Sequence, residues 1–322
     1  MDLLLISSAF GLLTISFLLT QLVRLALVYL RPSRLSRFAH ASPSGAAPWA
    51  LVTGASDGIG RAFAQELAAA GFNVALHGRN RDKLSKVVEL FQAEFPQREF
   101  TILVADAGLV PCGACLETTG PSPELVAMQQ QLSSLHLTVL INNAGGGTGI
   151  FQPVSAAAPI TTAKNTSLNA LFPLELTRML LPQLARNGPS LVVNLSTMGD
   201  AGFPLIASYS ASKAFTMAIT RALRLEMLMN NEPVEVLGIK VGRVTGTGPC
   251  RDPSSTFLPS AETMAKAALS KAGYGGGIVV GYWAHAIQQL GASLFAVLPE
   301  WVEDNVKIGI MRKMEDTRKT KA

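Results

Sequence analysis

From residue 49 onward, short apolar segments alternate with longer segments of helical character, and this alternation constrains the fold more than any other feature. β-Strands are predicted at residues 49–53, 73–76, 100–105, 138–142, 190–196, 234–241 and 277–280. Helices are predicted at residues 59–70, 81–93, 124–135, 163–186, 208–230 and 261–272. Nearly continuous apolar strands that alternate with helices are typical of a parallel sheet covered on both faces. The sequence therefore predicts an α/β fold with a doubly wound parallel sheet.

A glycine-rich segment lies where the first predicted strand ends and the next helix begins. It reads Thr53-Gly54-Ala55-Ser56-Asp57-Gly58-Ile59-Gly60. Glycines at such a turn let the backbone approach a pyrophosphate, and the helix N-terminus supplies amide donors and a favourable dipole. A purely structural turn is the alternative, but the position between strand and helix favours a dinucleotide. The candidate cofactor-binding residues here are Gly54, Ser56, Asp57, Gly58, Ile59 and Gly60.

The residues after the second and third predicted strands bear on the choice of cofactor. An acidic residue after the second strand would bind the ribose 2′-hydroxyl of NAD, but Arg79 is found there. An arginine can meet a 2′-phosphate, which predicts NADP(H), with a solvated arginine as the alternative. Asp106 ends the third strand and is a candidate for holding the adenine amino group. A strand-end turn residue is its alternative interpretation.

A tyrosine and a lysine open a predicted helix and form the candidate catalytic pair. Tyr209 and Lys213 are four residues apart, so both project from one face of the helix. A nearby ammonium favours the phenolate, which predicts a lowered pKa for Tyr209 and a role in acid–base catalysis. Ser196 ends a strand thirteen residues earlier. A hydroxyl at that edge of a parallel sheet can hydrogen-bond a carbonyl oxygen of a ligand.

As a set, these motifs resemble the short-chain dehydrogenase/reductase family. Further matches are Asn142-Asn143-Ala144-Gly145 and Asn169, which precedes Ser196 by 27 residues. The resemblance implies a Rossmann core of seven parallel strands over residues 48–282. It also implies that Tyr209 is the general acid or base, that Ser196 positions the carbonyl, and that Lys213 holds the nicotinamide ribose.

The resemblance implies roles for further residues. Asn169 would support a proton-relay water, and Asn143 would lie beside the adenosine ribose. Val244 and Thr245, after the sixth strand, would line the nicotinamide carboxamide. In that segment the chain departs from the family, which often has Pro-Gly where this sequence has Val241-Gly242.

The N-terminus carries an apolar segment of 21 residues, 3–23, that contains no charge. As a helix it would span roughly 31 Å, close to the ~30 Å hydrocarbon core of a bilayer. The basic residues that follow are Arg24, Arg31, Arg34 and Arg37. The positive-inside rule then predicts a single-pass anchor with the domain in the cytosol. A cleaved signal peptide and a peripheral anchor are alternatives; Asp2 and the length of the segment disfavour the signal peptide.

A narrower resemblance is to the microsomal very-long-chain 3-oxoacyl-CoA reductases and the related hydroxysteroid 17-beta dehydrogenases. It rests on the anchor before the glycine motif and on Gly281-Tyr282-Trp283-Ala284-His285-Ala286, followed by an apolar stretch to Leu298. It implies NADPH-dependent reduction of a 3-oxoacyl-CoA in fatty-acid elongation at the endoplasmic reticulum, with a homodimer or elongation-complex partners. A hydroxysteroid or secondary-metabolite ketoreductase is the alternative. A non-catalytic NADP-binding membrane scaffold is disfavoured by the complete catalytic set.

Composition, charge and cysteine content exclude several functions and support a division of the chain into four segments. Hydrophobic residues make up 48% and charged residues 15% of the chain, and the net charge is +5. The excess positive charge follows the anchor and lies in the tail, so nucleic-acid binding is not expected. Three cysteines cannot form a disulfide framework, and no metal site is predicted, Cys112-x-x-Cys115 lacking a second pair. The predicted divisions are an anchor (1–30), a basic linker (31–47), the reductase domain (48–282, with a substrate loop at 246–262) and a membrane-proximal helical extension with a basic tail (283–322).

Overall fold

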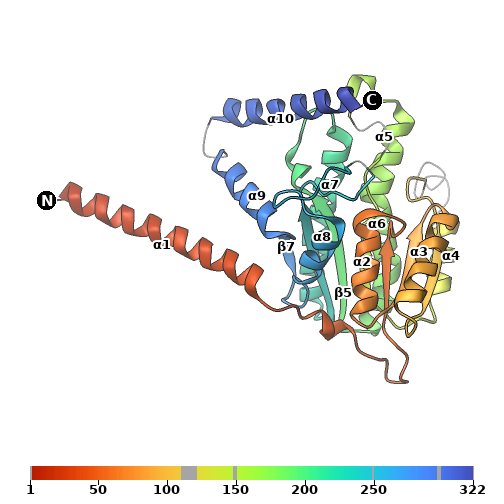
Figure 1. The fold of residues 1–322 in the computed structure, drawn as a ribbon. Helices are drawn as coiled ribbons and strands as arrows, with labels where there is room; N and C mark the ends of the chain where they lie inside the picture. Colours follow the sequence, from red (N-terminus) through yellow and green to blue (C-terminus); the bar gives the residue numbers. More distant parts are fainter. Residues whose placement is uncertain (1, 110–121, 148–150, 249, 296–298, 322) are drawn as a thin grey trace.

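The computed structural model describes residues 2–109, 122–147, 151–248, 250–295 and 299–321 (Figure 1). Seven strands form one sheet in the order β3-β2-β1-β4-β5-β6-β7, and every neighbouring pair is parallel. They are β1 (Trp49–Thr53), β2 (Asn73–Gly78), β3 (Phe100–Val104), β4 (Leu137–Asn142), β5 (Ser190–Thr197), β6 (Val234–Val241) and β7 (Gly277–Val280). The strand order reverses between β1 and β4, and doubly wound folds bind ligands at the carboxyl ends of the strands beside such a point. The predicted doubly wound parallel sheet is confirmed.

Helices cover both faces of the sheet. One face packs against α2 (Gly58–Ala69), α3 (Arg81–Glu94) and α8 (Ala261–Leu269). The other face packs against α4 (Pro123–Leu132), α6 (Phe172–Arg186) and α7 (Ala207–Met229). In β1, Ala50 and Val52 belong to the first core cluster and Leu51 to the second, because successive side chains of a strand point to opposite faces. Burial on both faces explains why the strands are almost continuously apolar.

The single helix predicted at residues 163–186 is divided in the structure. α5 (Pro159–Thr166) is followed by a π-helical turn at Ser167–Leu171, and α6 begins after it. Such turns are rare and are often found at functional sites. Asn169 lies in this turn and is fully buried. The helical irregularity therefore positions one of the predicted site residues.

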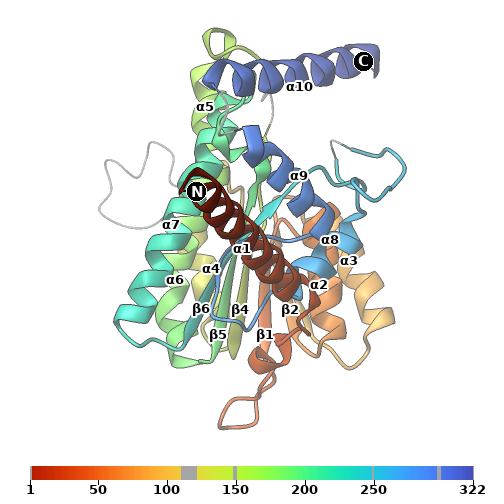
Figure 2. The same cartoon turned by 90° about the vertical axis from the view of Figure 1, so that its left-hand side faces the viewer.

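The N-terminal helix α1 (Asp2–Leu30) projects away from the sheet domain (Figures 1 and 2). Its segment Phe10–Leu30 is long and apolar enough to cross a membrane, by length and composition only, and its apolar window is 0% buried within the protein. Among the described residues, this is the one helix that meets those criteria.

The segment after α1 packs against the domain. A 3-10 turn at Leu35–Phe38 buries Leu35 and Phe38 in the core cluster on the side of α2 and α8. Thr138 of β4 donates a hydrogen bond from Oγ1 to the Phe38 carbonyl at 2.8 Å. Part of the segment expected to be a linker is therefore attached to the sheet domain.

Two helices, α9 (Trp283–Phe295) and α10 (Glu300–Lys321), follow β7. His285 of α9 is fully buried, and its Nδ1 accepts a hydrogen bond from the Gly242 amide at 3.1 Å. Its Nε2 lies 3.2 Å from the Arg243 carbonyl oxygen. These contacts fix α9 to the end of β6. α10 lies across the carboxyl-terminal edge of the sheet, at the top of both ribbon views (Figures 1 and 2).

Candidate active site

A cleft of about 1260 Å³ opens at the carboxyl ends of the central strands. The predicted site residues on its wall are Gly54, Asp57, Gly58, Ile59, Gly60, Asn143, Ser196, Tyr209, Lys213 and Val244. The predicted residues that are not on its wall are Ser56, Arg79, Asp106, Asn169 and Thr245. The structure therefore brings the glycine turn together with Ser196, Tyr209 and Lys213 at the strand-order reversal, where doubly wound folds bind ligands, while Asn169 of the predicted catalytic set lies off the wall.

The glycine turn is shaped by close backbone contacts. Gly54 has a φ of +67°, a conformation that favours glycine. A Cβ on Gly60 would lie 2.1 Å from the Gly54 carbonyl oxygen and 2.4 Å from Nδ2 of Asn143. Asp57 caps α2, its carboxylate accepting a hydrogen bond from the Gly58 amide at 2.8 Å. The tight turn leaves backbone at the cleft wall beside a helix N-terminus, which fits the pyrophosphate of a dinucleotide.

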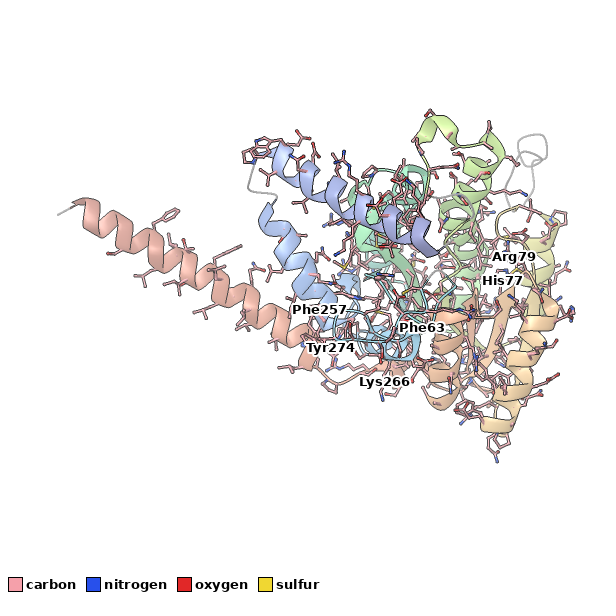
Figure 3. The ribbon with its side chains drawn as sticks, turned by 45° about the horizontal axis from the view of Figure 1, so that its top comes forward. Phe63, His77, Arg79, Phe257, Lys266 and Tyr274 are labelled. Atoms are coloured by element: carbon pink, nitrogen blue, oxygen red, sulfur yellow. The ribbon has the colours of Figure 1, made fainter. Side chains whose placement is uncertain are left out.

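The residues predicted to contact the adenosine end lie at neighbouring strand ends. Arg79 directly follows β2, is exposed, and lies close to the buried His77 (Figure 3). Asp106 follows β3, and its Oδ1 accepts a hydrogen bond from the Gly108 amide at 3.0 Å. Asp106 therefore stabilises the turn that follows β3, which is the alternative role that the sequence allows for it. Arg79 lies off the cleft wall, so its contact with a 2′-phosphate stays a prediction.

Lys213 is a buried residue of the cleft wall. Its side chain comes from α7, and its Nζ donates a hydrogen bond to the Leu195 carbonyl of β5 at 3.0 Å. Burial lowers the pKa of Lys213 to about 8. A Cβ on Gly145 would lie 2.9 Å from this Nζ, so only a glycine leaves room for the ammonium there. Lys213 is therefore held rigidly and remains mostly protonated at neutral pH.

The predicted lowering of the Tyr209 pKa is not what the structure shows. Burial raises the pKa of Tyr209; a hydrogen bond from the Thr197 side chain opposes this rise, and the Asp200 carboxylate adds to it. The physical reason is that the phenol is desolvated while the Lys213 ammonium is held on the Leu195 carbonyl. Tyr209 is consequently protonated at neutral pH, which is the form that a general acid requires.

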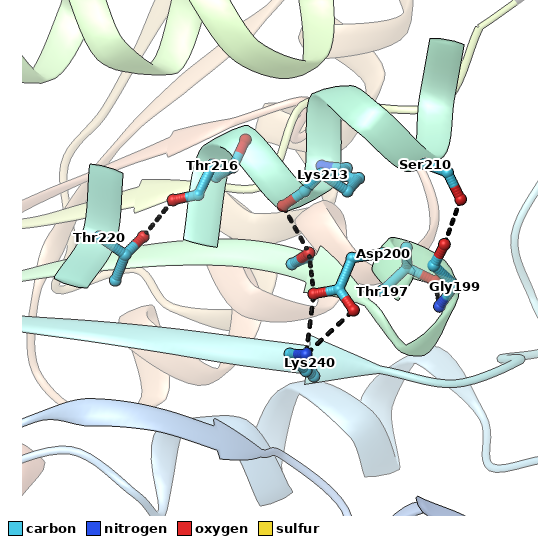
Figure 4. Close-up of polar contacts among 9 residues, drawn as sticks. Thr197, Gly199, Asp200, Ser210, Lys213, Thr216, Thr220 and Lys240 are labelled. Carbon is cyan, nitrogen blue, oxygen red and sulfur yellow. Dashed lines mark hydrogen bonds and ion pairs between the residues drawn. The ribbon is translucent and has the colours of Figure 1, made fainter. Parts of the chain in front are cut away.

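Ser196 belongs to a polar network that the sequence did not predict, and Figure 4 shows the contact between Asp200 and Lys240 in this network. The Ser196 Oγ donates to the Lys213 carbonyl at 3.1 Å and lies 3.5 Å from Oδ2 of Asp200. Asp200 forms an ion pair with Lys240 at 2.9 Å, and the Asp200 side chain is only 8% exposed. Lys240 is the register partner of Ser196 on the neighbouring strand β6. The sequence contains one signal for this network, because Lys240 interrupts an apolar strand. A charge at such a buried position is expected to be paired with an opposite charge.

Asn169 and Thr245 serve the local structure. The Oδ1 of Asn169 accepts a hydrogen bond from the Gly146 amide at 2.9 Å, and its Nδ2 donates to the Gly146 and Asn165 carbonyls at 2.7 and 2.8 Å. Asn169 thus fixes the segment after β4. Thr245 is buried and donates to the Asp252 carbonyl. Cys112 and Cys115, for which no role is predicted, lie outside the described residues.

Comparison with known proteins identifies the family. The family model "short chain dehydrogenase" matches residues 48–252. The chain belongs to the short-chain dehydrogenase family. It is therefore an oxidoreductase of the nicotinamide-dependent kind, and the predicted resemblance to this family is confirmed.

Relatives within the short-chain dehydrogenases cover most of the chain. A very-long-chain 3-oxoacyl-CoA reductase-like protein of Arabidopsis thaliana is 30% identical over 88% of this chain and 86% of its own length. A very-long-chain 3-oxoacyl-CoA reductase of Emericella nidulans is 26% identical over 80% of this chain and 74% of its own length. These names match the narrower resemblance seen in the sequence.

Solved short-chain dehydrogenases share the fold. A 7beta-hydroxysteroid dehydrogenase has a TM-score of 0.67 at 20% identity and covers 83% of this chain and 97% of its own. A short-chain dehydrogenase from Sphingobium yanoikuyae in complex with NADPH has a TM-score of 0.61 at 20% identity, covering 79% and 97%. At this level of identity, both similarities establish the fold of the sheet domain.

Proposed function

We propose that this short-chain dehydrogenase is a membrane-anchored reductase that uses NADPH to convert the ketone of a long-chain 3-oxoacyl-CoA to an alcohol during fatty-acid elongation. The observation that best supports a ketoreductase is the placement of Ser196, Tyr209 and Lys213 on the wall of the cleft that contains the glycine turn. The names of the relatives support the substrate class.

Each residue of the cleft has its own role in the proposed reaction. When bound, NADPH supplies a hydride to the ketone carbon. Tyr209 donates its phenolic proton to the carbonyl oxygen, which becomes the alcohol hydroxyl. Ser196 hydrogen-bonds the same oxygen, and for this it must turn its hydrogen away from the Lys213 carbonyl. The raised pKa of Tyr209 keeps the proton available at neutral pH.

Lys213 supports both the cofactor and the acid. Its ammonium, held by the Leu195 carbonyl, can bind the ribose hydroxyls of the nicotinamide. Its positive charge also stabilises the phenolate that forms when Tyr209 gives up its proton. The turn at residues 54–60 would hold the pyrophosphate, and Arg79 the 2′-phosphate.

The proposed location is the membrane of the endoplasmic reticulum. α1 would cross the bilayer once, and its apolar segment Phe10–Leu30 meets the length requirement. Arg31, Arg34 and Arg37 follow without an intervening acid, so the positive-inside rule places the sheet domain in the cytosol.

The proposal is tested with the full-length protein solubilised in detergent. NADPH oxidation is followed with a 3-oxoacyl-CoA series and a ketosteroid panel. We expect turnover of the long-chain thioesters and its loss in Tyr209→Phe, whereas Tyr282→Phe, a change off the cleft wall, should retain activity. Turnover by Tyr209→Phe would reject the mechanism, and turnover of ketosteroids alone would favour a hydroxysteroid reductase.

A further inference from the structure

α10 forms part of the cleft wall. Ile310, Lys313, Met314 and Thr317 line the same cleft as Tyr209. Their spacing of three and four residues places them on one face of the helix. On the domain side, Met311 is buried, and Nζ of Lys307 lies 5.9 Å from the centre of the Phe203 ring. The C-terminal helix therefore covers the cleft at the edge where Figures 1 and 2 show it.

The cleft face of α10 is both apolar and cationic. Ile310 and Met314 stay 46% and 38% exposed although they face the domain, so they offer apolar surface to a ligand. Two other lysines of α10, Lys307 and Lys319, pair with Glu303 and Glu315, each at 2.8 Å. Lys313 forms no ion pair within the described chain. It is thus the α10 cation that the cleft presents to a ligand.

A second cation comes from the segment between β6 and α8. Arg251 is exposed on the cleft wall, and it forms no ion pair with any described residue. Arg243 is also on the wall, but it pairs with Asp252 at 2.7 Å. The cleft wall therefore holds two exposed cations, Arg251 and Lys313, that form no ion pair with described residues and lie in the same cleft as an apolar surface. The glycine turn, Tyr209 and the buried Lys213 are other parts of the same wall.

A coenzyme A thioester has the complementary chemistry. Its acyl chain is apolar, and its nucleotide end carries a pyrophosphate and a 3′-phosphate, which bind best to lysine and arginine. We propose that Lys313 of α10 and Arg251 bind the phosphates of coenzyme A at the mouth of the cleft, while Ile310 and Met314 contact its apolar part. This subsite rests on the proposed function, because it requires an acyl-CoA substrate.

Lys313 and Arg251 could instead bind the phosphates of NADPH. A pair of substrates distinguishes binding of coenzyme A from binding of NADPH. The same 3-oxoacyl group is offered as its coenzyme A thioester and as its N-acetylcysteamine thioester, which has no phosphate. In Lys313→Met and in Arg251→Met we expect KM for the coenzyme A thioester to rise about tenfold, as for one lost charge-assisted contact. KM for the N-acetylcysteamine thioester and for NADPH should be unchanged.

Two variants and one condition serve as controls. Arg312→Met removes an exposed cation of α10 that is not on the cleft wall, and it should leave every KM unchanged. Lys313→Arg keeps the charge and should restore the low KM. Added salt should raise KM for the coenzyme A thioester in the wild-type protein and less in Lys313→Met, because ions screen exposed charges.

The outcomes that overturn the proposal are distinct. A rise in KM for NADPH would assign the cations to the dinucleotide. An equal rise in KM for both thioesters would mean that Lys313 acts through the packing of α10. An unchanged KM for both thioesters would mean that Lys313 does not contact coenzyme A. These results leave the proposed reductase intact. Wild-type protein that reduces ketosteroids but neither thioester would instead reject the acyl-CoA substrate, and the subsite with it.

Discussion

The ion pair between Lys240 and Asp200 lies beneath the Ser196 hydroxyl, and removing its cation should destabilise the protein measurably. The ammonium is 2.9 Å from each carboxylate oxygen. The two side chains are 22% and 8% exposed, respectively. Removing one partner of a buried pair costs roughly 3–5 kcal/mol. Because water can partly reach this pair, we expect Lys240→Met to lower the free energy of unfolding by about 3 kcal/mol.

A double-mutant cycle separates the loss of the pair from general damage. Asp200→Asn alone leaves the Lys240 cation unpaired, so it should also destabilise. The double variant Asp200→Asn/Lys240→Met removes both charges, and replacing a buried pair with neutral groups is often neutral for stability. We therefore expect the double variant to be more stable than Lys240→Met, with a coupling energy of about 2 kcal/mol.

Thermal unfolding of the detergent-solubilised protein measures the effect. A domain of this size loses about 2–4 °C in Tm per kcal/mol, so Lys240→Met should lower Tm by about 6–12 °C. Lys266→Met, at an exposed position of α8 (Figure 3), is the matched control and should shift Tm by at most about 2 °C. A double variant whose Tm falls by the sum of the two single shifts would refute the ion-pair reasoning.

The same variants have a second readout at Tyr209. Reduction needs the protonated phenol, so kcat/KM must fall as pH rises through the pKa of Tyr209. The Asp200 carboxylate is one of the groups that raise this pKa. Asp200→Asn should therefore move the alkaline limb to lower pH. Lys240→Met leaves the carboxylate uncompensated and should move the limb to higher pH, so shifts in the same direction would contradict this electrostatic link.

Three further perturbations test other parts of the molecule. Burial lowers the pKa of His77 to about 4 from 6.5. As pH falls, the unfolded chain is therefore protonated at this histidine before the folded chain is. The free energy of unfolding should decrease by up to about 3 kcal/mol as pH drops from 6.5 to about 4. Denaturant unfolding at several pH values measures this decrease, which should be smaller in His77→Gln. A Cβ on Gly60 would lie 2.1 Å from a backbone oxygen, so Gly60→Ala should abolish NADPH binding measured by fluorescence; Gly291→Ala, which meets nothing within 4 Å, should not. Arg79→Ala should raise KM for NADPH about tenfold with little change for NADH, whereas Arg98→Ala, before the start of β3, should alter neither. Equal losses for both dinucleotides would reject the 2′-phosphate contact.

The sheet could be predicted because its signal is repeated in every strand. The five inner strands are largely buried on both faces, so each of them is an apolar segment between helical segments. The glycine turn and the catalytic pair were also predictable, because their chemistry depends on spacing along one chain segment. Tyr209 and Lys213 do lie on the cleft wall as the spacing requires. The direction of the Tyr209 pKa was not predictable, because spacing does not say that the ammonium is held by Leu195.

Features that depend on contacts between distant segments were not available from the sequence. Lys240 reaches the site only because strand register pairs it with Ser196, and a short turn after β5 brings Asp200 back to both. The π-helical turn at Ser167–Leu171 interrupts a segment whose helical pattern is continuous, so a single helix was the natural prediction. The position of α10 over the cleft likewise depends on packing rather than on periodicity.

The C-terminal end of α1 contacts the sheet at its edge strand β7, close to the start of α9. At the foot of α1, the Tyr29 hydroxyl donates to the Val280 carbonyl of the edge strand β7 at 2.6 Å. α9 starts directly after β7, on the same side of the domain as α1 (Figure 1). Its residues Trp283, Ile287 and Leu290 are 46–50% exposed and recur at helical spacing, which makes an apolar stripe. Under the proposed membrane anchoring of α1, the same bilayer would meet this stripe, and the two contacts together would hold the domain in one orientation.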